Sequence, residues 1–174
     1  MMIRQATLQD IDSIMELIAQ VLPIMQATGN LQWDHTYPNA AVYTSDVEAG
    51  QLWVADIDGA IAGVIAVIVN EQEAEYAQVP GWDITEPCIV AHRLAVSPHM
   101  QGKGIAAQLL QQCEVIAIKN NIGLVRLDTN TVNRPMQNLF LKLGYKLGGE
   151  IELNKRPGML FMAFEKRLDP QIIS

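Results

Sequence analysis

The sequence predicts an α/β protein built on a mixed sheet, and three observations support this fold class. Short apolar segments of strand length alternate with stretches whose apolar residues recur every three or four positions. The Asp58-Gly59 pair separates two adjacent strand candidates, which is typical of an antiparallel hairpin. In the middle of the chain a strand, a helix and a strand follow one another, which indicates a right-handed crossover and a locally parallel pair.

The N-terminal half predicts one strand, two helices and a hairpin. Thr7 and Asp10 have the spacing of a capping box, which marks the start of a helix. Apolar residues at helical spacing follow, and we expect this helix to end at about Val21, with Pro23 near its end. The predicted elements are a strand over residues 2–6, helices from after Thr7 to about Val21 and from about Asn39 to Ala49, and strands over 51–56 and 60–70.

The C-terminal half predicts the parallel pair and a final antiparallel pair. Gly144 closes the last helix, and Pro157-Gly158 forms the last turn. The predicted elements are a strand over 87–96, a helix over 104–120, a strand over 124–128, a helix over 133–143 and two strands after Gly144. The expected order is therefore strand, two helices, three strands, helix, strand, helix and two strands.

Length and composition indicate a single globular domain over residues 1–174. Apolar residues make up 49% of the chain and charged residues 18%, which excludes a disordered protein. The longest apolar run, 60–69, is about half of what a membrane-spanning helix needs, and the N-terminus has no signal-peptide profile. Cys88 and Cys113 lack metal-ligand spacing. We therefore expect a cytoplasmic protein with reduced cysteines, no metal and no membrane partner.

The charge of the chain argues against a nucleic-acid partner. The formal net charge is -7, whereas phosphate backbones require clustered Lys and Arg. An acidic surface instead favours a cationic acceptor, although many proteins are acidic simply to stay in solution.

The stretch "HRLAVSPHMQGKGIAAQLL", residues 92–110, predicts a phosphate-binding loop. An apolar strand ends at Val96, Gly102 and Gly104 follow, and a helix then begins. Helix N-termini attract anions, and glycines let the backbone approach them closely. The P-loop and dinucleotide patterns are both incomplete here, so a nucleotide-binding protein is a secondary alternative.

Two motifs together resemble the GNAT family of N-acetyltransferases. "Q-G-K-G-I-A" (101–106), preceded by "RLAVSP", is similar to the family's Q/R-x-x-G-x-G/A loop, and "N-x-x-M-x-x-L-F-x-K-x-G-Y" (133–145) resembles its later helix. The resemblance extends over essentially the whole chain. It implies a mostly antiparallel central sheet with a parallel pair splayed at its centre and helices on both faces.

The resemblance also implies acetyl-CoA as the acetyl donor. The pantetheine arm would lie in a split between the strand ending at Val96 and the strand 124–128, with its amides paired to backbone groups. Phe140 stands where the family has the tyrosine that protonates the thiolate. Either water or another tyrosine, such as Tyr145 or Tyr43, supplies that proton, or the chemical step tolerates the absence of a donor. The implied cofactor-binding residues are Leu94, Ala95, Val96, Gln101, Gly102, Lys103, Gly104, Ile105, Ala106, Asn133 and Phe140.

Two residues are candidates for the catalytic base. His92 precedes Val96 by four residues, so strand alternation would place it on the face of Leu94 and Val96, beside the thioester. Glu86, just before the strand, could act through a water molecule. His92 as an ordinary hydrogen-bonded histidine and Glu86 as a solvated carboxylate remain the alternatives.

We expect a small-molecule or peptide amine as the acceptor, bound by Trp33, Tyr37 and Trp82, with a packing role as the alternative for each of these aromatics. The function that follows is transfer of an acetyl group to a primary amine by direct attack in a ternary complex. The alternative is a catalytically degenerate member that binds acyl-CoA as a sensor or interaction module. The resemblance also makes a homodimer plausible.

Overall fold

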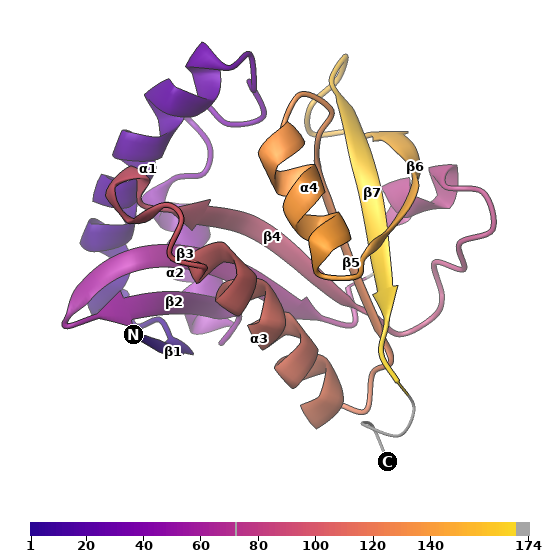
Figure 1. Ribbon diagram of the computed structural model, residues 1–174, viewed down its shortest axis with the longest axis horizontal. Helices are drawn as coiled ribbons and strands as arrows, with labels where there is room; N and C mark the ends of the chain where they lie inside the picture. Colours follow the sequence, from indigo (N-terminus) through magenta and orange to yellow (C-terminus); the bar gives the residue numbers. More distant parts are fainter. Residues whose placement is uncertain (72, 170–174) are drawn as a thin grey trace. The chain divides into compact units, whose positions relative to one another are not determined.

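The order of elements predicted from the sequence is confirmed by the computed structural model, which describes residues 1–71 and 73–169 (Figure 1). Three short 3-10 turns, Leu8–Asp10, Ala74–Gln78 and Pro98–Met100, lie between the main elements. None of the helices in these ranges is both long and apolar enough to cross a membrane. The strands are β1 Met2–Gln5, β2 Leu52–Ile57, β3 Ala60–Val69, β4 Ile89–Val96, β5 Leu124–Asn130, β6 Lys146–Glu152 and β7 Leu160–Arg167, and the helices are α1 Ile11–Ala27, α2 Ala40–Glu48, α3 Ile105–Lys119 and α4 Arg134–Lys142.

The predicted mixed sheet is also confirmed. Hydrogen-bonded neighbours follow the order β1-β2-β3-β4-β5-β7-β6. The pairs β1/β2, β2/β3, β5/β7 and β6/β7 are antiparallel, whereas β4 and β5 are parallel. The parallel ladder runs only from Ile89 with Val125 to Ala91 with Leu127, although both strands continue beyond it. The two strands therefore pair over a short stretch.

The chain divides into two compact units, each made of two separate segments. Unit 1 contains residues 1–67 and 92–112, and unit 2 contains the described residues of 68–91 and 113–174. The chain enters each unit twice, and no stretch of linker composition marks the crossings. The expectation of a single domain stays a prediction.

Unit 1 is built on the β1, β2 and β3 ladders. Asp58 and Gly59 both have positive φ angles, 53° and 87°, which is the turn that an Asp-Gly hairpin adopts. The capping box is present, because the backbone N–H of Thr7 donates to Asp10 Oδ2 over 2.7 Å. α1 packs its apolar face against β2 and β3 in a core that includes Ile14, Ile18, Leu52, Val54 and Val64.

The predicted end of the first helix is wrong by about one and a half turns. α1 continues through Pro23 to Ala27. Proline removes one helical hydrogen bond, but Leu22 and Met25 beside it pack against the buried core of unit 1. Burial of these two side chains offsets the missing bond, so the helix does not stop where its sequence suggests.

Unit 2 is built on the β5, β7 and β6 ladders. β5 pairs with β7 from Leu124 with Arg167 to Asn130 with Phe161, which is the whole length of β5. The segment 74–84 packs Tyr76 and Val79 into a core with Leu124, Ile151 and other apolar residues of the strands. Unit 2 thus combines the C-terminal strands with the segment that leads into β4.

Candidate active site

The predicted phosphate loop lies in unit 1, between β4 and α3. Gly102 and Gly104 have φ angles of 78° and 75°, a backbone conformation that is strained for any L residue with a side chain. A Cβ atom at either position would meet nothing within 4 Å, so it is conformation rather than space that requires glycine here. Residues 101–104 are exposed, and α3 begins directly after them at Ile105. The loop is therefore an open turn at a helix N-terminus.

A third glycine, Gly63 in β3, leaves room for the start of α3 to lie close to that strand. A Cβ atom on Gly63 would lie 3.0 Å from both Ile105 Cγ2 and Leu109 Cδ1, and 3.1 Å from the carbonyl oxygen of Ala95. Ile105 and Leu109 are themselves buried. The absence of a side chain at position 63 thus allows the first two turns of α3 to approach the strand, which fixes the place of the helix N-terminus within unit 1.

β4 contains a backbone irregularity that the sequence does not reveal. Arg93 has a φ angle of 54° although it lies inside the strand. The other non-glycine residues with positive φ among those described, Asp58, Asn70 and Asn121, all lie in turns. Regular alternation does not hold across a left-handed residue, so it cannot place His92 on the face of Leu94 and Val96. The placement of His92 on that face therefore stays a prediction.

The Arg93 side chain is clamped within unit 1. Its Nε and Nη2 atoms donate to the two carboxylate oxygens of Asp46 over 2.9 and 2.8 Å, and its Nη1 donates to the hydroxyl oxygen of Tyr37 over 3.1 Å. The Arg93 and Asp46 side chains are only 11% and 10% exposed. Asp46 lies in α2 and Tyr37 in the segment before it. We refer to Arg93, Asp46 and Tyr37 as the Arg93 clamp.

In unit 2, Asp128 is the first β5 residue after the parallel ladder. The hydroxyl of Tyr76 donates to Asp128 Oδ2 over 2.9 Å. Tyr76 is 1% exposed, and burial together with the Asp128 charge raises its pKa, so the hydroxyl stays protonated and can donate. Tyr76 and Asp128 lie 52 residues apart, and nothing in their spacing connects them.

The next two residues of β5 order the start of α4. The Asn133 side-chain amide donates to Thr129 Oγ1 over 2.9 Å, and Asn130 Oδ1 accepts the backbone N–H of Val132 over 3.0 Å. Asn133 thus has a fixed side chain at the N-cap of α4. Its contact with the pantetheine arm stays a prediction.

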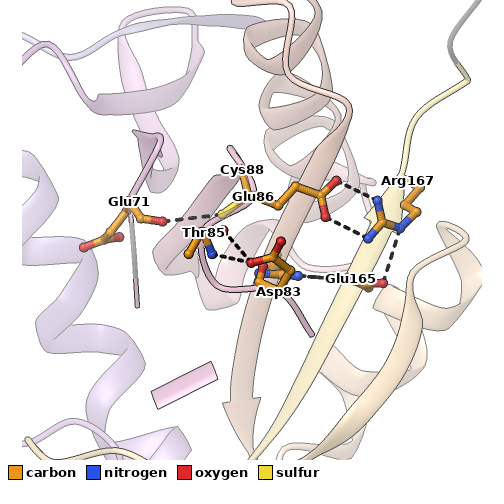
Figure 2. A network of polar contacts seen from close by, with 8 residues as sticks. Glu71, Asp83, Thr85, Glu86, Cys88, Glu165 and Arg167 are labelled. Atoms are coloured by element: carbon orange, nitrogen blue, oxygen red, sulfur yellow. Dashed lines mark hydrogen bonds and ion pairs between the residues drawn. The ribbon is translucent and has the colours of Figure 1, made fainter. Parts of the chain in front are cut away.

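Glu86 is bound to Arg167, as Figure 2 shows. Two nitrogens of the guanidinium donate to the two carboxylate oxygens over 2.8 and 3.0 Å. This hydrogen-bonded pair lowers the pKa of Glu86. A carboxylate stabilised in its charged form is a weaker base, so the geometry does not favour Glu86 as the group that accepts the proton of the amine.

Phe140 and the two alternative tyrosines are core residues in the structure. The Phe140 ring is 3% exposed, and its centroid lies 5.2 Å from that of Phe164 and 6.0 Å from that of Tyr145. Among the described residues, the buried hydroxyls of Tyr43 and Tyr145 have no hydrogen-bond partner. Burial raises the pKa of both, which makes them poor proton donors to a thiolate.

The three predicted acceptor-binding aromatics are all engaged within their own units. Trp33 is 6% exposed in the core of unit 1, and Tyr37 belongs to the Arg93 clamp. In unit 2 the Arg126 guanidinium lies 4.5 Å from the centroid of the Trp82 ring, and the Tyr76 ring meets Trp82 edge-on at 5.5 Å. Each of these contacts gives the ring a packing role. An acceptor contact stays a prediction for all three.

A family model describes the same chain. The model of the acetyltransferase (GNAT) family matches residues 16–145, well over half of the sequence. The chain belongs to the GNAT family. GNAT enzymes use acetyl-CoA as the acetyl donor, and membership of the family implies an amine as the acceptor. The seven-stranded mixed sheet with the parallel β4/β5 pair is the GNAT fold.

Individual relatives and solved structures agree with this assignment. The GNAT chain is 28% identical over 140 residues to N-acetylaspartate synthetase of Danio rerio. The matched region covers 75% of this chain but 45% of that protein. It is 26% identical over 146 residues to the uncharacterized N-acetyltransferase YesJ of Bacillus subtilis (strain 168), covering 83% and 81%. A GNAT acetyltransferase structure from Streptococcus agalactiae 2603 superposes with a TM-score of 0.83 at 29% identity, covering 97% and 95%. The chain thus spans less than half the length of the Danio rerio synthetase.

The residues at the glycine turn fit the pyrophosphate of acetyl-CoA. The two left-handed glycines carry no Cβ atom that would cover the turn, and they precede the free backbone N–H groups expected in the first turn of a helix. Lys103 adds a positive charge from an exposed position. The donor set is suited to a phosphate anion, which is what this end of acetyl-CoA carries.

Proposed function

We propose that this GNAT enzyme transfers the acetyl group of acetyl-CoA to a primary amine by direct attack in a ternary complex. The observation that supports the proposal is the open glycine turn at the N-terminus of α3. The backbone of Gln101 to Ala106 would bind the pyrophosphate, with Lys103 adding charge. Gly63 supports this role because it allows Ile105, the first residue of α3, to be held firmly against β3.

The end of β4 would hold the pantetheine arm. Ala95 is 4% exposed and belongs to the core of unit 1, which anchors the strand, whereas Leu94 and Val96 are only half-buried. Backbone groups of Leu94 and Val96 would pair with the pantetheine amides as an added strand does. A backbone N–H in this segment would donate to the thioester oxygen as negative charge develops on it.

His92 would act as the base. The acceptor nitrogen must lose a proton before or during attack, after which the new C–N bond forms, the C–S bond breaks and the thiolate takes up a proton. His92 is half-buried and lies one residue before the Arg93 clamp. Glu86 is a weaker candidate because Arg167 holds its carboxylate. With Phe140, Tyr43 and Tyr145 all in cores, we assign protonation of the thiolate to water.

Two observations guide the choice of acceptors to be tested. The net charge of -7 favours a cationic amine. The similarity to N-acetylaspartate synthetase makes aspartate a specific amine to include. We therefore propose a small-molecule or peptide primary amine as the acceptor, with polyamines, agmatine, aspartate and a short peptide as the first panel.

Thermal unfolding with four ligands tests the donor. At about one hundred times its dissociation constant, a ligand stabilises the folded state by roughly 2.7 kcal/mol, which is a shift of about 5–10 °C for a chain of this size. CoA and acetyl-CoA are expected to give this shift, and ATP and NAD are not. Stabilisation by ATP alone would contradict the proposal.

Thiol release from acetyl-CoA then tests the transfer. Release that depends on an amine supports the proposed reaction, and binding of acetyl-CoA without release by any amine of the panel would favour a sensor. Within this assay, His92→Gln is expected to lower kcat/KM about a hundredfold or more, and Glu86→Gln tests the weaker candidate. An unchanged pH–rate profile in His92→Gln would remove His92 from the mechanism.

A further inference from the structure

Arg93 occupies a backbone conformation that its own side chain disfavours. For a residue that has a Cβ atom, the left-handed backbone conformation is higher in free energy than the extended one. Residues with long side chains rarely adopt it inside a strand. The described positive-φ residues other than Arg93 are glycines, two asparagines and an aspartate in a turn, types that adopt it readily. Something outside the local sequence must therefore hold Arg93 in place.

The Arg93 clamp supplies that restraint. Two parallel N–H···O bonds to Asp46 fix both the position and the plane of the guanidinium, and the bond to Tyr37 Oη fixes it from a second side. Both charged side chains are about nine-tenths buried, so water competes little for these bonds. Lysine could not reproduce this geometry, because it lacks the planar fork.

We propose that Arg93 is a positioning residue for the donor-binding end of β4. The Arg93 clamp holds Arg93 in the left-handed conformation. This local change in the backbone sets the direction in which the peptide groups of Leu94 to Val96 point. The inference rests on the proposed function, in which these groups bind the pantetheine arm. It predicts that CoA affinity depends on the conformation at position 93 and not only on the charge there.

Two double variants separate conformation from charge. Arg93→Gly/Asp46→Asn and Arg93→Ala/Asp46→Asn both remove the ion pair without leaving a buried carboxylate unpaired. Glycine adopts the left-handed conformation freely, whereas alanine favours the extended one by a factor of about ten. The alanine variant is therefore expected to bind CoA about tenfold more weakly than the glycine variant, with the wild type at least as tight as glycine.

A CoA fragment provides the control. Adenosine 3′-phosphate 5′-diphosphate carries the phosphates of CoA but no pantetheine arm, so its affinity should be the same in both variants. Both dissociation constants can be measured by calorimetry, by direct titration for CoA and by competition for the fragment. If only one variant unfolds at the assay temperature, Arg93→Lys with Asp46 intact replaces the pair, and it is expected to weaken CoA binding and to leave fragment binding unchanged.

The outcomes are distinct. A weaker CoA affinity in the alanine variant, with unchanged fragment affinity, supports the positioning role. Equal CoA affinity in the two variants, or a parallel loss of fragment affinity, overturns it while the proposed function stands. A wild-type protein that does not bind CoA would overturn the proposed function, and this inference with it.

Discussion

The Gly148→Ala substitution tests the packing of unit 2 most directly. Gly148 lies in β6 where the register with β7 shifts, and a Cβ atom there would overlap Trp82 Cζ2, with Trp82 Cε2 at 2.7 Å and Val79 Cγ1 at 3.0 Å. The Trp82 ring has little room to retreat. The Arg126 guanidinium lies 4.5 Å from its centroid, and the Tyr76 ring meets it edge-on. An added methyl group must therefore displace a side chain that is held by two others.

The expected destabilisation follows from this overlap. Overpacking a core by one methyl group costs about 1–3 kcal/mol, and a displaced Trp82 would also weaken its contact with Arg126 by roughly 0.5–1 kcal/mol. We expect a loss of about 2–3 kcal/mol, which lowers the midpoint of thermal unfolding by about 4–12 °C.

The neighbouring glycine is a matched control. A Cβ atom on Gly149 would meet only Val79 Cγ1 at 3.7 Å, an ordinary contact. Gly149→Ala is therefore expected to be neutral or to stabilise the protein by a few tenths of a kcal/mol, because alanine restricts the unfolded chain. Thermal unfolding by circular dichroism and urea titration would measure both variants. Equal midpoints for Gly148→Ala and Gly149→Ala would refute the reasoning.

Three further predictions concern other parts of the molecule. Hydrogen bonds from Arg4 lower the pKa of Asp10 to about 2. The ionised Asp10 therefore stabilises the folded state above the usual carboxyl pKa, and this stabilisation is lost as the pH falls through 2. The midpoints of thermal unfolding of wild type and Asp10→Asn should thus differ by a few degrees at pH 6, and the difference should shrink towards zero near pH 2. Glu86→Gln should cost less than about 1 kcal/mol, because its partner Arg167 is 58% exposed, and a large shift of the neutral pH–rate profile in this variant would restore Glu86 as the base. Gly63→Ala should weaken CoA binding by displacing the start of α3, measured by titration with CoA; unchanged affinity would show that β3 and α3 adjust without moving the glycine turn.

The sequence by itself determined the order of elements and the glycine turn. Both depend on signals between residues close in the chain: apolar periodicity, the Thr7 and Asp10 capping box, the Asp58-Gly59 turn, and Gly102 with Gly104 before a helix. Such signals act over a few residues, because helix caps and turns are satisfied within one or two turns of backbone. The resemblance to the GNAT family also rests on short motifs, residues 101–106 and 133–145.

Only the tertiary structure decided which side chains hold the candidate site. Arg93 meets Asp46 across 47 residues, Tyr76 meets Asp128 across 52, and Glu86 meets Arg167 across 81. No local rule relates residues so far apart, since their pairing depends on which strands and helices become neighbours after folding. The same holds for Pro23, which is tolerated in α1 because the partly buried Leu22 and Met25 pack against a core that includes residues of distant strands. Long-range burial and ion pairing, which no periodicity in the sequence encodes, thus decided the surroundings of these side chains.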